Sequence, residues 1–236
     1  MNKVFGLVLS AALVTTTAYA GERVGDFALI DHQGAFQHMA WYDDHSAVVI
    51  MPMTSSQDDV ASLKALQQKY AGQSVQFFLL NPGLHSDRAR VQNEIAAMCL
   101  DLPVLMDDAQ LVTGMLGVSR LDEAVLYNPG NFEMLYRGPI ADMDSSLQQL
   151  LAGDDFEMVA VASDGPAIEF TNLQAHANLS YEKDIAPIIA ENCASCHRDG
   201  GIAPFAMDSN LAVQGWSPMI REVLMTKRMP PGPIDR

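Results

Sequence analysis

Two kinds of apolar pattern alternate along the first two-thirds of the chain. Unbroken apolar runs at residues 47–51 and 75–80 predict strands that are buried on both faces. Between these runs, apolar residues recur every three or four positions over residues 60–70, which predicts a helix with Ser55 or Ser56 as its N-cap. Strand, helix and strand in this order are typical of a sheet that helices cover.

The same patterns continue to residue 153. They predict further strands at residues 26–30, 104–106, 124–127 and 132–137, and further helices at residues 86–98, 109–116 and 142–151. Gly34 lies in a turn after the first strand, Asn128-Pro129-Gly130-Asn131 predicts a hairpin, and Gly153 ends the last helix. We therefore expect residues 21–153 to form an α/β sandwich around a mixed sheet.

Residues 154–180 are predicted to connect this domain to a second one. They hold several turn residues, but Val159, Val161 and Ile168 fall in an alternating pattern. The connector is therefore expected to add one or two strands at an edge of the sheet.

Residues 181–236 are predicted to form a small all-α domain. Ser180 can cap a helix that runs to about residue 192. A second helix is expected to begin at Ser217-Pro218, because a serine cap followed by proline is a frequent helix start. It should end before Pro230, since proline disfavours helical geometry at the preceding residue.

The N-terminus has the pattern of an export signal. Lys3 precedes an apolar run over residues 4–14, and Ala18-Tyr19-Ala20 is a small-x-small cleavage site. We expect residues 1–20 to be a signal peptide that is cleaved after Ala20, which makes the mature protein periplasmic. No later stretch approaches the roughly 18 apolar residues that a spanning helix needs, so no membrane span is expected.

The charge balance restricts the class of partner. The sequence carries a formal net charge of −15, and most of its acids lie before residue 171. This field repels polyanions, so it argues against binding to nucleic acid or to an anionic membrane. A protein partner with a basic or neutral surface is the more natural match.

The stretch Cys193-Ala194-Ser195-Cys196-His197 carries the most specific chemistry. The C-x-x-C-H spacing is the signature of covalent c-type haem attachment. Each thiol, Cys193 and Cys196, would add to one vinyl group of a porphyrin, and the imidazole of His197 would reach the iron from one face as the proximal ligand. Pro204-Phe205 begins a loop that can supply a backbone carbonyl to the other imidazole nitrogen.

Three other interpretations of this motif are a chance match, half of a zinc site and a thioredoxin-like dithiol. A structural zinc site needs four ligands, and the one further cysteine, Cys99, lies far upstream. A redox dithiol is expected directly after a strand in a βαβ unit, which is not the predicted setting here. Haem c is therefore the leading hypothesis.

Met229 is the candidate for the distal haem ligand. It directly precedes Pro230, after a helix whose apolar face can pack on the haem. Methionine and histidine ligation raises the potential, which suits an electron carrier. The alternatives are His176, another of the 14 methionines, or an open sixth position.

The first domain resembles the redoxin branch of the thioredoxin fold. Its landmarks are Gly25-Asp26-Phe27-Ala28-Leu29, Asp31, Gly34 and Tyr127-Asn128-Pro129-Gly130. The catalytic landmarks differ, because Pro52-Met53-Thr54-Ser55-Ser56 stands where a redoxin has its nucleophilic cysteine, and residues 121–122 lack the expected cis-proline. Thiol chemistry needs a thiolate, so this domain is expected to be catalytically empty. Cys99 is predicted to be a buried thiol, with a reactive or intermolecular thiol as the alternative.

The second domain gives the most specific resemblance. Its motifs are Tyr181 to Ile189, Cys193 to His197, Gly200 to Phe205, Trp216 to Glu222 and Arg228-Met229-Pro230-Pro231. These resemble a bacterial family that joins a redoxin-like domain to cytochrome c and, in longer chains, to a region similar to copper type II ascorbate-dependent monooxygenases. The resemblance implies haem attachment at Cys193 and Cys196, with His197 and Met229 as iron ligands.

The resemblance also bears on copper and on partners. This sequence ends soon after the Met-Pro-Pro run, before the positions of a copper module, so we expect a natural short form or a fragment with no copper site of its own. A copper monooxygenase-like protein or module is then a possible electron-transfer partner. The preferred function is a periplasmic monohaem electron carrier whose redoxin-like domain docks a partner. The alternatives are a haem-dependent oxidoreductase or peroxidase, and a redox-sensing interaction module.

Overall fold

The computed structural model describes residues 23–54, 56–85, 87–154 and 157–229. In chain order the elements are β1 Ala28–Ile30, β2 Phe36–His38, η1 Met39–Tyr42, β3 Ala47–Pro52, α1 Gln57–Lys69, β4 Val75–Asn81, α2 Arg88–Ala97, β5 Val104–Met106, α3 Leu111–Met115, β6 Glu123–Asn128, β7 Glu133–Pro139, η2 Ile140–Asp142, α4 Asp144–Ala152, β8 Val159–Ala160, α5 Thr171–His176, η3 Tyr181–Ile185, α6 Ala186–Asn192 and α7 Asn210–Met225. The predicted signal peptide, Ser55 and residues 230–236 lie outside this description.

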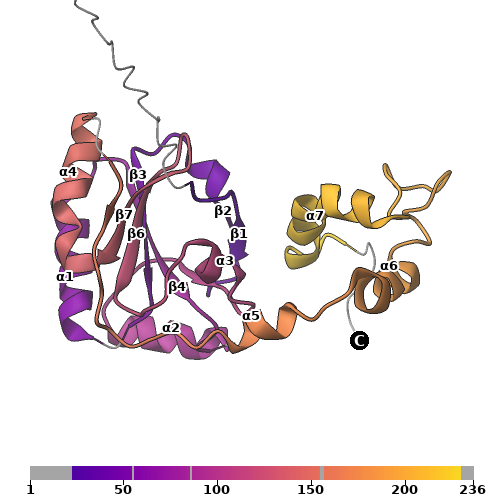
Figure 1. The fold of residues 1–236 in the computed structure, drawn as a ribbon, viewed down its shortest axis with the longest axis horizontal. Helices are drawn as coiled ribbons and strands as arrows, with labels where there is room; N and C mark the ends of the chain where they lie inside the picture. The colour runs from indigo at the N-terminus through magenta and orange to yellow at the C-terminus, as the bar shows by residue number, and fades with distance from the viewer. Residues whose placement is uncertain (1–22, 55, 86, 155–156, 230–236) are drawn as a thin grey trace, which may run out of the picture.

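A six-stranded mixed sheet forms the centre of the first domain (Figure 1). Its strand order is β5-β4-β3-β6-β7-β8, with β3, β4 and β5 parallel to one another and β6 antiparallel to both β3 and β7. All six residues of β3 are buried, as its unbroken apolar run predicts. A separate hairpin of β1 and β2 lies beside the sheet.

Apolar side chains of β3 pack in two hydrophobic cores, one on each face of the sheet. Val49 and Met51 belong to the core that α1, α2 and α4 cover. Val48 and Ile50 point the other way, into the core beneath β1, η1 and α3. The predicted α/β sandwich is therefore confirmed for this part of the chain, and Figure 1 shows α1 and α4 together on one face.

Two helix ends in this domain lie where the sequence predicts them. Ser56 caps α1, because its side chain accepts a hydrogen bond from the backbone N–H of Asp59 at 3.2 Å. Gly153 ends α4 with a φ of +74°, in the left-handed region that glycine adopts without strain.

The connector packs against the sheet domain over much of its length. Val159 and Ala160 form β8, which pairs in parallel with β7, so the predicted edge strand is confirmed. Further along, the backbone N–H of Leu121 donates to the carbonyl of Pro166 at 2.9 Å. The backbone N–H of Ile168 donates to the carbonyl of Ser119 at 2.8 Å. Ile168 is buried in the core beneath α3.

The helix α5 was not predicted. It has six residues and no side-chain cap, so its local sequence gives little indication of a helix. A tertiary contact supports it instead. The side-chain oxygen of Gln110 accepts hydrogen bonds from the backbone N–H groups of Asn172 at 2.9 Å and Leu173 at 3.3 Å.

The helical segment after residue 180 begins at the predicted cap. The Ser180 side chain accepts from the N–H of Lys183 at 3.4 Å, and Asp184 accepts from the N–H of Ser180 at 2.6 Å. The chain then runs through η3 into α6, which ends just before the C-x-x-C-H motif.

The predicted start of the last helix was wrong. α7 begins at Asn210, and its cap is Ser209, whose side chain accepts from the N–H of Ala212 at 3.2 Å. Pro218 lies inside the helix and has no N–H for the carbonyl of Gln214. The hydroxyl of Ser217 donates to that carbonyl at 2.8 Å, which compensates for the missing backbone bond.

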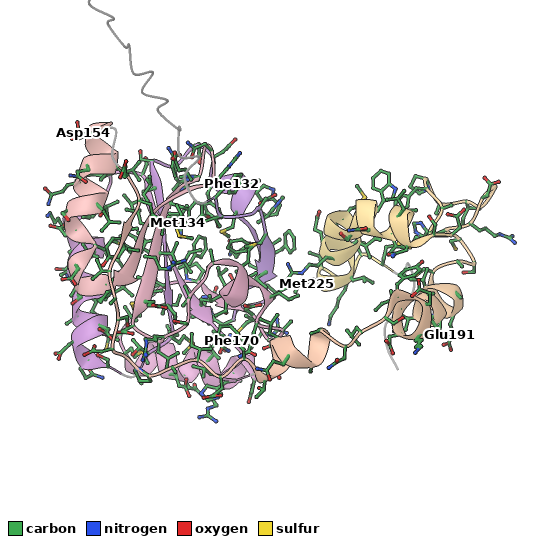
Figure 2. The ribbon with its side chains drawn as sticks, in the orientation of Figure 1. Phe132, Met134, Asp154, Phe170, Glu191 and Met225 are labelled. Atoms are coloured by element: carbon green, nitrogen blue, oxygen red, sulfur yellow. The ribbon has the colours of Figure 1, made fainter. Side chains whose placement is uncertain are left out.

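The two parts of the chain meet at α7. This helix lies against β1 of the sheet domain, and Figure 2 shows Met225 at the end of α7 that is nearer to the sheet. Among the described residues, no helix combines the length and the apolar character that a bilayer span requires.

Candidate functional site

The motif Cys193 to His197 lies in a tight turn that directly follows α6. Cys193 is the C-cap residue, and its carbonyl accepts from the N–H groups of Cys196 at 3.2 Å and His197 at 2.9 Å. These bonds bring both thiols and the imidazole onto one turn of chain. Such a short turn can present all three groups to the same ligand.

His197 is the most deeply buried residue of the motif. The residue is only 8% exposed, although it lies in a segment with few buried residues. Its Nδ1 lies 3.0 Å from the carbonyl oxygen of Phe205, so the predicted carbonyl contact is confirmed. Because a carbonyl can only accept, Nδ1 must carry the proton, and this leaves the lone pair on Nε2 for a metal.

The loop of residues 198–208, which we call the Phe205 loop, is held against the motif at two further points. The N–H of Ala203 donates to the carbonyl of Cys196 at 3.2 Å, and that of Met207 donates to the carbonyl of His197 at 2.8 Å. Gly201 makes this approach possible, because a β-carbon there would collide with the carbonyl oxygen of Cys196.

Aromatic rings connect the motif to α7. The ring of Phe205 lies 4.7 Å from the His197 ring at an interplanar angle of 55°. The Phe205 ring also stacks on the ring of Trp216 in α7, with ring centroids 4.4 Å apart and an interplanar angle of 17°. Both distances are typical of favourable aromatic pairs. The loop and the last helix are thus joined through side chains as well as through the chain itself.

Several large apolar side chains between residues 179 and 229 are exposed. Ile202 is 92% exposed and Leu211 is 79% exposed. The other large exposed apolar side chains of this segment are Leu179, Ile188, Trp216, Met219, Leu224 and Met229. Exposed apolar side chains of this size are available to a ligand or a partner. A large, flat apolar ligand bound beside His197 would fit this donor set and this surface.

The two motif thiols do not have the character of a redox dithiol. Both are free and partly buried, and burial raises the pKa of the Cys193 thiol above its ordinary value. Disulfide exchange relies on the opposite shift, because the thiolate is the attacking species. Thioether formation with a porphyrin remains the chemistry that the spacing predicts.

The described residues also lack a set of ligands for a zinc site. Within the described ranges, no group of three or more His, Cys, Asp or Glu side chains is arranged to hold a metal ion. Cys99 lies on the sheet domain, directly after α2, and so does not complete a four-ligand set with the motif.

Met229 is more exposed than His197. Its backbone N–H donates to the carbonyl of Val223 at 3.1 Å, which holds it just beyond α7, and the residue is 37% exposed. Its role as distal ligand therefore stays a prediction. The side chain of His176, the alternative ligand, lies outside the part of the chain that the structure describes.

The position of a redoxin nucleophile carries no thiol in this protein. Met53 and Thr54 follow β3 and are buried, and the Thr54 hydroxyl accepts from the N–H of Ser56 at 3.1 Å. At the expected cis-proline position, Asp122 accepts from the Ser163 hydroxyl and from the N–H of Gly165, the latter at 3.1 Å. The connector thus packs against this loop.

The prediction that Cys99 is buried was wrong, because the residue is exposed. It follows the C-cap of α2 in a left-handed conformation with a φ of +52°. The N–H of Leu100 donates to Ile95 at 3.2 Å, and Leu100 takes the buried position at this helix end. Cys99 therefore points outward.

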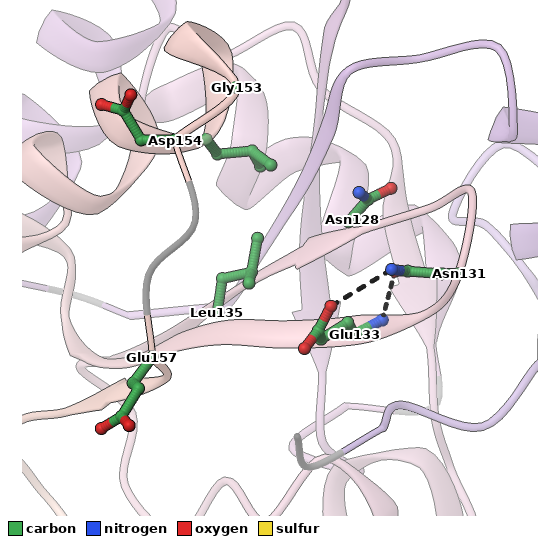
Figure 3. Close-up of a pocket in the computed structure, with 8 residues that line it drawn as sticks. Asn128, Asn131, Glu133, Leu135, Gly153, Asp154 and Glu157 are labelled. Atoms are coloured by element: carbon green, nitrogen blue, oxygen red, sulfur yellow. Dashed lines mark hydrogen bonds between the residues drawn. The ribbon is translucent and has the colours of Figure 1, made fainter. Parts of the chain in front are cut away.

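A hollow lies in the sheet domain (Figure 3). It has a volume of about 590 Å³ between the β6–β7 hairpin and the end of α4, and Glu133, Asp154 and Glu157 are among its lining residues. Asn131 bonds to Glu133 across its rim, with the side-chain amide donating at 3.2 Å. We assign no chemistry to this open, acidic hollow.

Comparison with known proteins places the fold but names no family. No protein-family model and no curated protein matches the chain. A crystal structure of a hypothetical protein from Sinorhizobium meliloti 1021 matches with a TM-score of 0.56 and 24% identity, over 64% of this chain and 94% of that one. An uncharacterized conserved protein from Geobacillus kaustophilus matches with a TM-score of 0.55 and 17% identity, over 63% and 90% of the two chains.

A third match is a thiol-disulfide oxidoreductase from Bacteroides fragilis. Its TM-score is 0.46 and its identity 16%, over 54% of this chain and 98% of that one. The matches above 0.5 show a shared fold for about two-thirds of the chain. The observed strand order, with three parallel strands and an antiparallel hairpin, defines that domain as thioredoxin-like.

Proposed function

We propose that the protein is an exported c-type monohaem electron carrier. The observation that carries this proposal is the hydrogen bond from Nδ1 of the buried His197 to the Phe205 carbonyl. This bond leaves Nε2 available to ligate a metal on the same turn as the two thiols. A chance C-x-x-C-H match does not predict a buried imidazole with this hydrogen bond.

The chain's own residues have distinct roles in this proposal. Cys193 and Cys196 would form thioethers with the haem, and His197 and Met229 would ligate its iron. The exposed apolar side chains of α6, the Phe205 loop and α7 would cover the porphyrin and exclude water. Haem c, once attached, supplies a one-electron couple between Fe(II) and Fe(III).

The thioredoxin-like domain would act as a docking or scaffolding part. It carries no thiol in the loop directly after β3, where a redoxin has its nucleophile, so redoxin thiol chemistry is not its expected role. Its acidic surface favours a protein partner with a basic or neutral face. The family resemblance makes a copper monooxygenase-like protein or module the first partner class to test.

A reductive titration tests the carrier function. Protein expressed with a cytochrome c maturation system should take up one electron per chain and release it reversibly to an oxidant. The C193A/C196A double variant should take up none, whereas C99A should behave as the wild type. Irreversible uptake, or equal uptake by the double variant, would rule out a monohaem carrier.

A haem-dependent oxidoreductase or peroxidase is the second candidate, and the exposure of Met229 favours it. A weakly held sixth ligand would let a small molecule reach the iron. The ferric protein should then be high-spin and should change its absorption spectrum when cyanide is added. A low-spin spectrum that cyanide leaves unchanged favours the carrier.

A further inference from the structure

We infer that Trp216 is a positioning residue for the imidazole of His197, and that it acts through Phe205. The inference rests on the proposed function, because the property it would set is the reduction potential of a haem bound to His197. Trp216 belongs to α7, whereas His197 and Phe205 belong to the turn and loop after α6. The last helix would thereby control a ligand on a different element.

The contacts form an unbroken series from the helix to the imidazole. The Trp216 ring is nearly parallel to that of Phe205, at 17°, with centroids 4.4 Å apart. The Phe205 ring lies 4.7 Å from the His197 ring, and the Phe205 carbonyl accepts from Nδ1 at 3.0 Å. A shift of Phe205 would therefore change both the packing and the hydrogen bond of the imidazole.

The other bonds of the Phe205 loop do not replace this contact. Ala203 and Met207 are tied to the motif by their backbone N–H groups, at 3.2 Å and 2.8 Å. These bonds fix the loop on either side of Phe205, but the orientation of the peptide that carries the Phe205 carbonyl depends on how its side chain is held. The stack on Trp216 holds that side chain.

A hydrogen bond at Nδ1 changes what a ligating imidazole does to iron. When Nδ1–H donates to a carbonyl, the imidazole becomes more basic and the ring orientation is fixed. A more basic ligand stabilises Fe(III) relative to Fe(II) and so lowers the reduction potential. Loss of the Trp216 stack should weaken the bond and raise the potential.

The test compares three variants of the haem-loaded protein: W216L, W216F and W41A. W216L keeps an apolar side chain but removes the aromatic face, and W216F restores a smaller aromatic face. Trp41, the other tryptophan of the chain, is exposed on η1 of the sheet domain and serves as the matched control. Potentiometry should show a positive shift for W216L, a smaller one for W216F and none for W41A.

A second readout is independent of haem. In the apo chain, ¹⁵N NMR of the imidazole should show Nδ1 protonated in the wild type and in W41A, and a mixture of tautomers in W216L. Unchanged potential and unchanged tautomer in folded W216L would overturn the inference. If the wild type itself never attaches haem, the proposed function fails, while the apo-chain tautomers still decide the role of Trp216.

Discussion

Gly201 lies directly against the carbonyl oxygen of Cys196, at a place where a β-carbon would collide with that oxygen. The Cys196 carbonyl also accepts the N–H of Ala203 at 3.2 Å, so the collision would displace the loop from the motif. We therefore predict that G201A destabilises the helical segment by about 1–3 kcal/mol, in the range of an overpacked site. It should also lower the yield of attached haem.

Gly215 gives the matched control for this prediction. It lies within α7, and a β-carbon there would meet nothing within 4 Å. G215A should therefore stabilise the helix, by about 0.8–1 kcal/mol at most. Thermal unfolding of both variants followed by circular dichroism checks the pair, and equal effects of G201A and G215A would contradict the proposed close contact.

Tyr127 provides a test of the sheet domain's core. Its side chain is fully buried and stacks on Phe132, yet its hydroxyl has no hydrogen-bond partner among the described residues. Burial raises the pKa of Tyr127 far above its ordinary value, so the group stays neutral. Y127F should increase the free energy of unfolding by about 1–3 kcal/mol, because an unpaired buried hydroxyl is costly.

Tyr136 is the contrasting residue, since its hydroxyl donates to the carbonyl of Pro139 at 2.8 Å. Y136F should lower the free energy of unfolding by about 1 kcal/mol. Urea denaturation measures both changes under the same conditions. A loss in Y127F as large as that in Y136F would show that the Tyr127 hydroxyl does have a partner, such as a buried water.

His32 should make the stability of the sheet domain depend on pH. It is buried in the turn after β1, and its Nδ1 accepts the N–H of Val104 at 3.1 Å. Burial lowers the pKa of His32 below 6.5, although the carboxylates of Asp31 and Asp101 act in the opposite direction. The folded state therefore favours the neutral ring, which can accept this bond.

The sign of the effect follows from which state binds the proton. Below the ordinary pKa of 6.5 the unfolded chain protonates His32 before the folded chain does. The stabilising contribution is complete above that value and is lost as the pH falls through the lowered pKa. H32N keeps an acceptor near the Nδ1 position without titrating, so its unfolding free energy should vary less with pH below 6.5. Equal pH slopes for the wild type and H32N would refute this role.

The distal ligand can be tested by spectroscopy on single methionine variants. If Met229 ligates the iron, the ferric protein should show the long-wavelength band of methionine ligation, and M229A should lose it. M219A is the control, because Met219 is also an exposed methionine, but it lies within α7. Retention of the band in M229A would assign the ligand to another residue.

Local patterns predicted most of the sheet domain, and tertiary contacts explain the errors. The run at residues 47–51 identified β3 because strands buried on both faces need no polar alternation. α5 depends on hydrogen bonds from Gln110, which no local pattern reveals. Cys99 was expected to be buried, but the left-handed helix end gives the inner position to Leu100 instead.

The same distinction applies within the candidate site. Cys193, Cys196 and His197 are candidates on their spacing alone, and their role stays a prediction. A carbonyl from the Phe205 loop was expected from the chemistry of a ligating imidazole and is observed. The stack of Phe205 on Trp216 could not be derived, because the rings belong to different elements. The start of α7 was misplaced because Ser217-Pro218 has the signature of a helix start, whereas Ser209 is the residue that caps it.

The central claim is that Cys193 and Cys196 hold one haem covalently, and the pyridine haemochrome spectrum tests it most directly. The protein should be exported and expressed together with a cytochrome c maturation system, and then denatured in alkaline pyridine. We predict the α-band of a haem with two thioether links, at one haem per chain, and its loss in the C193A/C196A variant. Folded protein that remains colourless after maturation would contradict the account.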